Sequence, residues 1–324
     1  MRNTSNGWRP RNGTPFAAWM RKKPLASARH NPAAACSPRA AATDWTSNLP
    51  ASIFPSSYVR GRKYRMPVTW KDSVTEIAGS KMHLSRAGSG KTVLVLHHDI
   101  GTADRLPFYD SLAEQFDVIV PHHPGWGKSQ RPEWIRHPRD IAAMHTWLLA
   151  DLGVENVNLV GLGFGGWIAA EMVSQSPRTY RRLSLVAPMG IKPPEGDIAD
   201  QAIVSYLDYP KAGFHSQDAF ASVYGEADTD QLEQWDVCRE MCFRTAWKPY
   251  MYSQTLPHLL GGVRTPAQVI WGDDDQIVPI SAGHAYTKAL RNATMTTVAE
   301  CGHFAEMEQP AKVAKLVIDF INAA

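Results

Sequence analysis

A glycine-rich turn between a strand pattern and a helix pattern constrains the fold of this chain more than any other segment. Residues 157–171 read VNLVGLGFGGWIAAE, in which an apolar strand runs into the turn and the turn runs into a helix. Gly161 and Gly165 indicate that the strand and the helix approach each other closely at a strained turn. The pattern is that of a G-x-S-x-G nucleophile elbow, whose central residue presents a hydroxyl. Gly163 stands at that position, so the expected nucleophile is missing.

Two motifs farther along the chain complete the constellation of which such an elbow is part. Residues 269–279 read VIWGDDDQIVP, an apolar strand followed by three acids, and residues 299–304 read AECGHF, a strand end that carries His303. The order elbow, acid and histidine is that of the α/β-hydrolase superfamily. Over about residues 74–324 the chain resembles that superfamily, and the three motifs together carry the resemblance.

The resemblance implies an α/β-hydrolase fold, with a mostly parallel sheet, helices on both faces and a helical lid insertion. The alternation of strand and helix patterns along the chain agrees with a parallel sheet. Strands are expected at 74–78 and 82–85, as a hairpin with its turn at 79–80, and at 92–97, 117–121, 157–161, 183–187, 267–272 and 294–299. Helices are expected at 107–116, around 141–152, at 166–176, near 281–290 and at the C-terminus.

Three segments are expected within the chain. Residues 1–65 are basic, with eight Arg or Lys and a single acid in the first 50, and show no core pattern, so we expect them to be disordered. Residues 66–187 and 267–324 form the α/β core. Residues 188–266 interrupt the alternation and are rich in aromatic residues, which suits a helical lid over an apolar pocket.

The bulk composition excludes several classes of function. The chain beyond residue 50 carries 26 basic and 30 acidic residues, which offers no case for a nucleic-acid partner. No apolar run reaches the ~18 residues that a membrane span requires. The four cysteines show no disulfide or zinc spacing and fit a reducing compartment, so a cytoplasmic location is expected. The basic, acid-poor N-terminus is also compatible with organelle targeting. The sequence is compatible with a homodimer as well.

The resemblance assigns roles to individual residues. His303 is implied as the general base, and Asp275 as the acid that orients and charges it. Asp273 and Asp274 are rivals for that acid, but the family pattern places it third after the strand-end glycine. The oxyanion hole is implied to use the backbone N–H of Phe164 together with one from the loop at Asp99.

The chain departs from the family pattern at two loops. The family commonly has His-Gly where this chain has His97-His98-Asp99, and it commonly has Asp where His122 stands. These loops leave neighbouring strands, so His97, His98, Asp99, His122 and His123 could converge and hold a metal. We favour a structural interpretation, in which one histidine of each pair packs inward and the other faces solvent. No metal and no cofactor is expected.

Three hypotheses account for the missing serine. In the first, the His303–Asp275 dyad activates a water or a substrate hydroxyl in the space beside Gly163, for hydrolysis, C–C cleavage or a lyase-type proton transfer. In the second, the chain binds a ligand and has lost the chemistry. In the third, the glycine is an engineered replacement. Cys301 as a substitute nucleophile is disfavoured, because its place at a strand end points into the core.

A small apolar or aromatic molecule is the expected substrate or ligand. The residues expected to contact it are His98, His122, Trp167, Trp247 and Tyr250.

Overall fold

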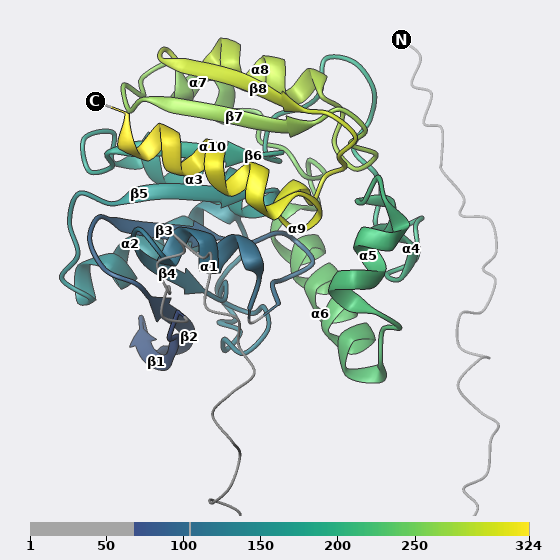
Figure 1. Cartoon of the computed structure of the whole chain (residues 1–324), viewed down its shortest axis with the longest axis horizontal. Helices are drawn as coiled ribbons and strands as arrows, with labels where there is room; N and C mark the ends of the chain where they lie inside the picture. The colour runs from purple at the N-terminus through teal and green to yellow at the C-terminus, as the bar shows by residue number, and fades with distance from the viewer. Residues whose placement is uncertain (1–67, 104, 324) are drawn as a thin grey trace, which may run out of the picture. The chain divides into compact units, whose positions relative to one another are not determined.

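The computed structural model describes residues 68–103 and 105–323, so the expected disordered extension over 1–65 lies outside the described residues. Within them, one sheet of eight strands has the order β1-β2-β4-β3-β5-β6-β7-β8 (Figure 1). The strands are β1 (Lys71–Ile77), β2 (Ser80–Ala87), β3 (Thr92–Leu96), β4 (Asp117–Pro121), β5 (Asn158–Leu162), β6 (Arg182–Val186), β7 (Ala267–Gly272) and β8 (Ala293–Val298).

The sheet is parallel except at one edge. Strands β1 and β2 form the expected antiparallel hairpin, with Ile77 paired to Ser80 across the turn, and β2 is antiparallel to β4. All the other pairs are parallel. The central strands are buried along almost their whole length because helices cover both faces, which is why their sequences are continuously apolar. The α/β-hydrolase fold expected from the sequence is confirmed.

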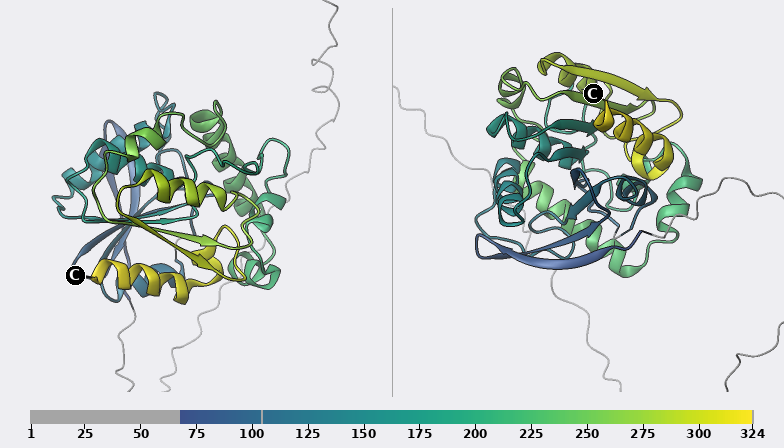
Figure 2. Two further views of the ribbon diagram at one scale, coloured as in Figure 1. Left: turned by 90° about the horizontal axis from the view of Figure 1, so that it is seen from above. Right: turned by 60° about the vertical axis from the view of Figure 1, so that its left-hand side comes forward.

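Helices form a layer on each face of the sheet (Figure 2). On one face α1 (Pro107–Ala113), α9 (Ala305–Glu308) and α10 (Pro310–Asn322) contact one another. On the other face α2 (Pro138–Asp151) packs against α3 (Phe164–Gln175), which contacts α7 (Leu256–Leu260), and α7 contacts α8 (Ser281–Ala289). None of the helices in the described part of the chain has the length and apolar character that a membrane crossing requires.

The glycine-rich turn has the close packing that its sequence predicts. A Cβ on Gly161 would lie 2.6 Å from Cα of Gly166, and a Cβ on Gly165 would lie 2.2 Å from the carbonyl oxygen of Leu96. Gly163 has φ +51° and ψ −111°, a backbone conformation that residues with a side chain rarely adopt. Helix α3 begins at once with Phe164, two residues earlier than expected.

The segment 188–266 between β6 and β7 contains α7 and three further helices. These are α4 (Asp208–Ala212), α5 (Gln217–Tyr224) and α6 (Thr229–Ala246), which lie beyond the arrowheads of the strands in Figure 1. The side chain of Asp228 caps the N-terminus of α6 by accepting from the N–H of Gln231. We call 188–266 the insert.

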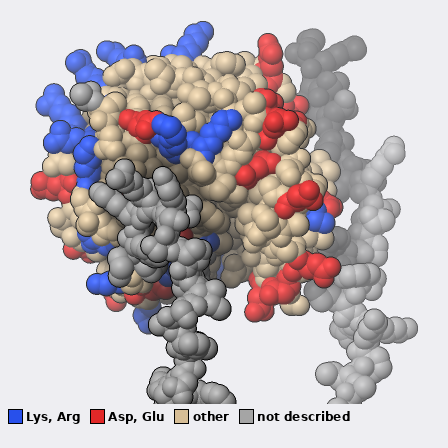
Figure 3. Space-filling view, in the orientation of Figure 1, with Lys and Arg blue, Asp and Glu red and all other residues tan. Residues whose placement is uncertain are grey.

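Ion pairs attach the insert to the α/β core. Arg131 contacts Glu240 on α6 at 2.8 Å, and Arg244 on α6 contacts Glu133 at 2.9 Å. Asp and Glu side chains gather on the side of the molecule that carries α4, α5 and α6 (Figure 3). Exposed acids of α6 and its N-terminal turn include Asp228, Glu233 and Asp236. The outer surface of the insert is therefore acidic where it is seen in that view.

Candidate active site

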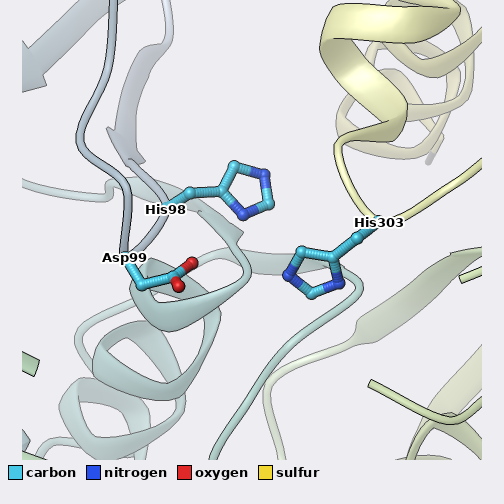
Figure 4. Close-up of side chains that lie close together, drawn as sticks. All are labelled: His98, Asp99 and His303. Carbon is cyan, nitrogen blue, oxygen red and sulfur yellow. The ribbon is translucent and has the colours of Figure 1, made fainter. Parts of the chain in front are cut away.

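Three buried polar side chains converge next to Gly163. His98 and Asp99 come from the loop after β3, and His303 comes from the loop between β8 and α9 (Figure 4). One nitrogen or oxygen atom from each of the three lies within 4.8 Å of the others. Each of these residues is at most 1% exposed. We call these three residues the His-Asp-His cluster.

His303 forms a dyad with Asp275. Its Nδ1 lies 2.8 Å from Oδ2 of Asp275. The other oxygen of Asp275 accepts from the backbone N–H groups of Ile277 and Val278, each at 2.9 Å. In a neutral imidazole this arrangement places the proton on Nδ1. Nε2 of His303 is then unprotonated and can act as a base toward the space beside Gly163.

The electrostatic surroundings of His303 favour its protonated form. Burial lowers the pKa of His303, but the charge and hydrogen bond of Asp275, together with the charges of Asp99 and Glu306, outweigh burial and raise the pKa above its ordinary value. The cluster is therefore a site in which buried negative charge attracts a positive one.

The two rival acids are engaged elsewhere. Asp274 lies 2.7 Å from Nδ1 of the exposed His215, and Asp273 accepts from the backbone N–H of Cys301 at 3.4 Å. The structure thus places Asp275, and not its neighbours, against His303.

The space beside Gly163 is filled by His98. A Cβ on Gly163 would lie 2.2 Å from Nδ1 of His98 and 3.1 Å from Nε2 of His303. The expected vacancy, large enough to seat a hydroxyl at this point, is therefore not open. An imidazole ring stands where the side chain of a nucleophile would be.

Two residues that the sequence did not single out hold the cluster in place. Nε2 of His98 contacts the buried carboxylate of Glu306 on α9, at 3.2 Å from Oε2 and 3.1 Å from Oε1. Gln201 in the insert donates from Nε2 to Oδ2 of Asp99 at 2.5 Å. Glu306 stands between the apolar Ala305 and Met307, both of which are buried. A charged residue in such a place, three positions after His303, was the sequence signal that could have identified it.

The other histidines of the two loops form a separate array that bonds to the backbone. Nδ1 of His97 donates to the carbonyl of His98, and Nε2 of His97 accepts from the N–H of His123. Nε2 of His123 faces the carbonyl of His97, so Nδ1 of His123 accepts from Nε2 of His145, at 2.8 Å. Burial and then the neighbouring imidazoles hold the pKa of His97 and His123 well below the ordinary value. These histidines are neutral and structural.

The expectation that one histidine of each pair faces solvent is wrong. His98 is fully buried in the cluster, and His122 is 5% exposed. Nδ1 of His122 accepts from the N–H of Lys128 at 3.3 Å, and its ring packs edge-on against His83. His122 lies apart from the His-Asp-His cluster.

The three aromatic residues expected to contact a ligand lie in different environments. Trp167 is buried and donates from Nε1 to Glu171 at 3.3 Å. Tyr250 accepts from the N–H of Gln201 and donates to the carbonyl of Ala199, so it supports the residue that holds Asp99. Trp247 is 51% exposed at the surface. The structure brings none of the three into the His-Asp-His cluster.

Two further expectations concern Phe164 and Cys301. Phe164 opens α3, so its backbone N–H is one of the first in the helix, which lack intrahelical partners. Cys301 is buried, and burial raises the pKa of its thiol, which makes it a poor nucleophile. The expectation that Cys301 points into the core is confirmed.

A small cavity of about 10 Å³ adjoins Asp99 on the side of the insert. Its wall includes Gln201, Tyr209 and Trp235. Among the described residues, the hydroxyl of Tyr209 and Nε1 of Trp235 are buried without a hydrogen-bond partner. A cavity of this size holds roughly one water molecule, so the insert packs closely against Asp99 at this point.

Comparisons with known proteins agree with this architecture. A family model described as "Alpha/beta hydrolase family" matches residues 93–316. The chain is 27% identical over 270 residues to a 2-hydroxy-6-oxononadienedioate/2-hydroxy-6-oxononatrienedioate hydrolase of Paraburkholderia phymatum, which covers 75% of this chain and 91% of that protein. It is also 27% identical over 281 residues to a 2-hydroxymuconate semialdehyde hydrolase of Pseudomonas sp. strain CF600, covering 76% and 92%.

Solved structures show the same fold. A 2-hydroxy-6-oxo-6-phenylhexa-2,4-dienoate hydrolase from Rhodococcus sp. strain RHA1 superposes with a TM-score of 0.65 at 22% identity, covering 79% of this chain and 100% of that one. A bacterial membrane phospholipase A superposes with a TM-score of 0.67 at 20% identity, covering 78% and 87%.

Proposed function

The chain belongs to the alpha/beta hydrolase family, and we propose that it hydrolyses a small aromatic or otherwise apolar substrate without a covalent intermediate. The observation that carries this proposal is the geometry of His303. Its Nδ1 is held by Asp275, and its Nε2 has no partner among the described residues and faces the elbow. A base oriented by a carboxylate is the part of a triad that works on water as well as on serine.

The proposed nucleophile is a water molecule in the His-Asp-His cluster. Nδ1 of His98, Oδ1 of Asp99 and Nε2 of His303 all lack a hydrogen-bond partner among the described residues. Three polar partners suit a buried water. His303 takes one proton from this water while the oxygen adds to the substrate carbonyl. The C–O or C–C bond then breaks, and the leaving group takes both bonding electrons and the proton from His303.

The substrate class is proposed from the relatives. Two of those named above are hydrolases of 2-hydroxy-6-oxo dienoates, one of them with a 6-phenyl group. A 6-oxo dienoate offers a ketone carbonyl for attack by water and a conjugated chain that accepts the electrons when the C–C bond breaks. We therefore propose an acyclic oxo-dienoate with an apolar or aryl group at the carbonyl as the substrate.

We propose that the insert is the lid over this site. The cavity beside Asp99 is too small for an aromatic molecule, so substrate entry requires that the insert move away. Gln201 and Cys242 on α6 both contact Asp99. The ion pair of Arg244 with Glu133 lies at the surface, where such pairs are weak.

The alternative is a ligand-binding protein without activity. Its supporting observation is the ring of His98, which fills the position of a nucleophile's side chain. The two functions differ in one measurable respect. A binding protein would quench its tryptophan fluorescence saturably with aromatic ligands and leave them intact.

The test is hydrolysis of 2-hydroxy-6-oxo-6-phenylhexa-2,4-dienoate, followed by loss of its visible absorbance, beside a panel of aryl esters. We expect turnover without a burst of bound product. His303→Ala and Asp275→Asn should each lower the rate, with the loss for His303→Ala at ~10²–10⁴-fold. His215→Ala, which removes the exposed partner of Asp274, is the matched control and should keep full activity. Saturable binding without turnover would leave the ligand-binding function as the better proposal.

A further inference from the structure

We propose that His98, Asp99 and His303 bind one divalent first-row transition-metal ion, with zinc or ferrous iron as the best fit to these ligands. This inference goes beyond the proposed hydrolysis and does not depend on it, because a metal can be bound whether or not a substrate is cleaved. It also reverses the expectation from the sequence that no metal is present, which rested on structural roles for the paired histidines of the two loops.

The first argument is the set of atoms that face one another. Nδ1 of His98, Oδ1 of Asp99 and Nε2 of His303 are buried and lack hydrogen-bond partners among the described residues. Three such atoms without partners carry a large desolvation cost. Ligand atoms of the three residues lie within 4.8 Å of one another, and a tetrahedral ion at ~2.1 Å from each would draw them to ~3.4 Å.

The second argument is that each facing residue is held from behind. The outer nitrogen of His98 contacts Glu306, and the outer nitrogen of His303 contacts Asp275. Gln201 donates to the outer oxygen of Asp99. Histidines that bind metals in proteins almost always donate their other ring N–H to a carboxylate, a carbonyl or a water. Both histidines of this cluster have a buried carboxylate in that position.

The third argument is charge. Asp99, Asp275 and Glu306 put three buried carboxylates around two imidazoles. Buried carboxylates are normally paired or coordinate metals. Three of them gathered in one place attract a divalent cation. Two imidazoles and one carboxylate with open positions form a ligand set typical of catalytic zinc and of non-haem iron.

This site also explains why position 163 is a glycine. A Cβ there would lie 2.2 Å from Nδ1 of His98, on the side of the ring that faces the other two ligands. Any side chain at this position would displace the imidazole and occupy the room needed by the ion. The cluster and a nucleophile at position 163 therefore exclude each other, because they require the same space.

Metal binding would change the role of His303. With its Nε2 on the ion, the imidazole cannot accept a proton, and the base of the metal-free protein becomes a ligand. A divalent ion held by these residues would supply Lewis-acid chemistry in place of that base. The two proposals thus differ in which state of the protein is active, and their tests are separate.

The first experiment uses the wild-type full-length protein without an affinity tag. Chelator-treated protein is titrated with Zn²⁺ alone, with calorimetry for stoichiometry and thermal unfolding for stability. We expect one equivalent bound and a raised melting temperature. Co²⁺ should give the visible absorption of a site with nitrogen and oxygen ligands. Wild-type protein that binds neither ion would overturn the proposal, and this result is independent of any activity.

Variants then locate the ion. Asp99→Asn keeps the shape of the ligand but removes its charge, and it should weaken Zn²⁺ binding by more than the ~10–100-fold expected for loss of an outer partner in Glu306→Gln. His215→Ala removes an exposed histidine that faces Asp274 and is the control for surface binding. Zinc that is lost in His215→Ala but retained in Asp99→Asn would place the ion outside the cluster and overturn the proposal.

Discussion

Replacing Gly163 by serine would supply the hydroxyl that the elbow lacks, but the structure predicts that this change alone gives a destabilised and inactive protein. The serine Cβ would lie 2.2 Å from Nδ1 of His98, whereas ordinary contacts begin at 3.4 Å. The ring would have to move by about 1.2 Å. His98 is fully buried, contacts Glu306 and packs edge-on against Phe304. The surroundings therefore leave it little room.

The size of the effect follows from two contributions. Forcing extra atoms into a packed site costs ~1–3 kcal/mol. Holding a residue with a side chain in the φ +51°, ψ −111° conformation of Gly163 costs ~1–3 kcal/mol more. Together these amount to about 2–6 kcal/mol, a large part of the ~5–15 kcal/mol that stabilises a typical domain. We expect Gly163→Ser to unfold at a clearly lower urea concentration than the wild type.

Removing the obstructing ring should reverse the outcome. In the double variant His98→Gly, Gly163→Ser the serine Cβ is free of the imidazole, and Nε2 of His303 lies 3.1 Å from it. The hydroxyl then falls within reach of the base. Activated esters of short acids should give a burst of product as an acyl-enzyme accumulates. Turnover should be weak because Asp99 stands at the oxyanion loop, and a missing donor costs ~10²–10³-fold.

The assay has two internal controls. His98→Gly alone should show no burst, and adding His303→Ala to the double variant should abolish the burst. The reasoning fails if Gly163→Ser alone is as stable as the wild type and acylates, because His98 would then not fill the position. It also fails if the double variant is folded and inert even after Asp99→Gly is added.

Three further predictions test other parts of the structure. Burial, and then the nearby His97, lower the pKa of His145 to about 3, so stability should be lost as the pH falls from the unfolded value of 6.5, by ~1.4 kcal/mol per pH unit. His145→Leu should reduce the loss between pH 6.5 and 5 by about 2 kcal/mol in urea unfolding, and an unchanged loss would contradict the buried neutral array. Gly190→Ala should lower the melting temperature far more than Gly153→Ala, since both have positive φ but only the Cβ on Gly190 meets the ring of Trp167, at 2.5 Å from its Cγ; equal shifts would show that packing there is loose. Cys301→Ala should leave hydrolysis unchanged, and a lost activity in folded protein would make the thiol a participant.

Local signals in the sequence were sufficient for the scaffold. The alternation of apolar strands and helices predicts the parallel sheet, because a buried strand needs an unbroken apolar run. The glycines of the elbow predict close contact between β5 and α3. The choice of Asp275 as the partner of His303 came from the resemblance to the α/β-hydrolase superfamily. Each of these patterns is contained in about ten neighbouring residues.

The contents of the site could not be predicted in the same way. His98 and Glu306 are 208 positions apart, and Gln201 reaches Asp99 from the insert across 102 positions. No periodicity connects such residues, because only the closed sheet and the packed insert bring them together. The sequence therefore indicated that the two histidine loops were unusual, but not which of their side chains turn toward His303.

Because Gly163 and His98 are in contact, a substitution at one position is tolerated only after a suitable substitution at the other. A serine introduced first meets the ring, and a histidine introduced at position 98 beside an existing serine meets the same atoms from the other side. The passable route between the two states runs through a chain with glycine at both positions, which has neither a seryl hydroxyl nor the imidazole of His98. A library of single substitutions would miss the double variant with glycine at position 98 and serine at position 163. A library that varies both positions together would contain it.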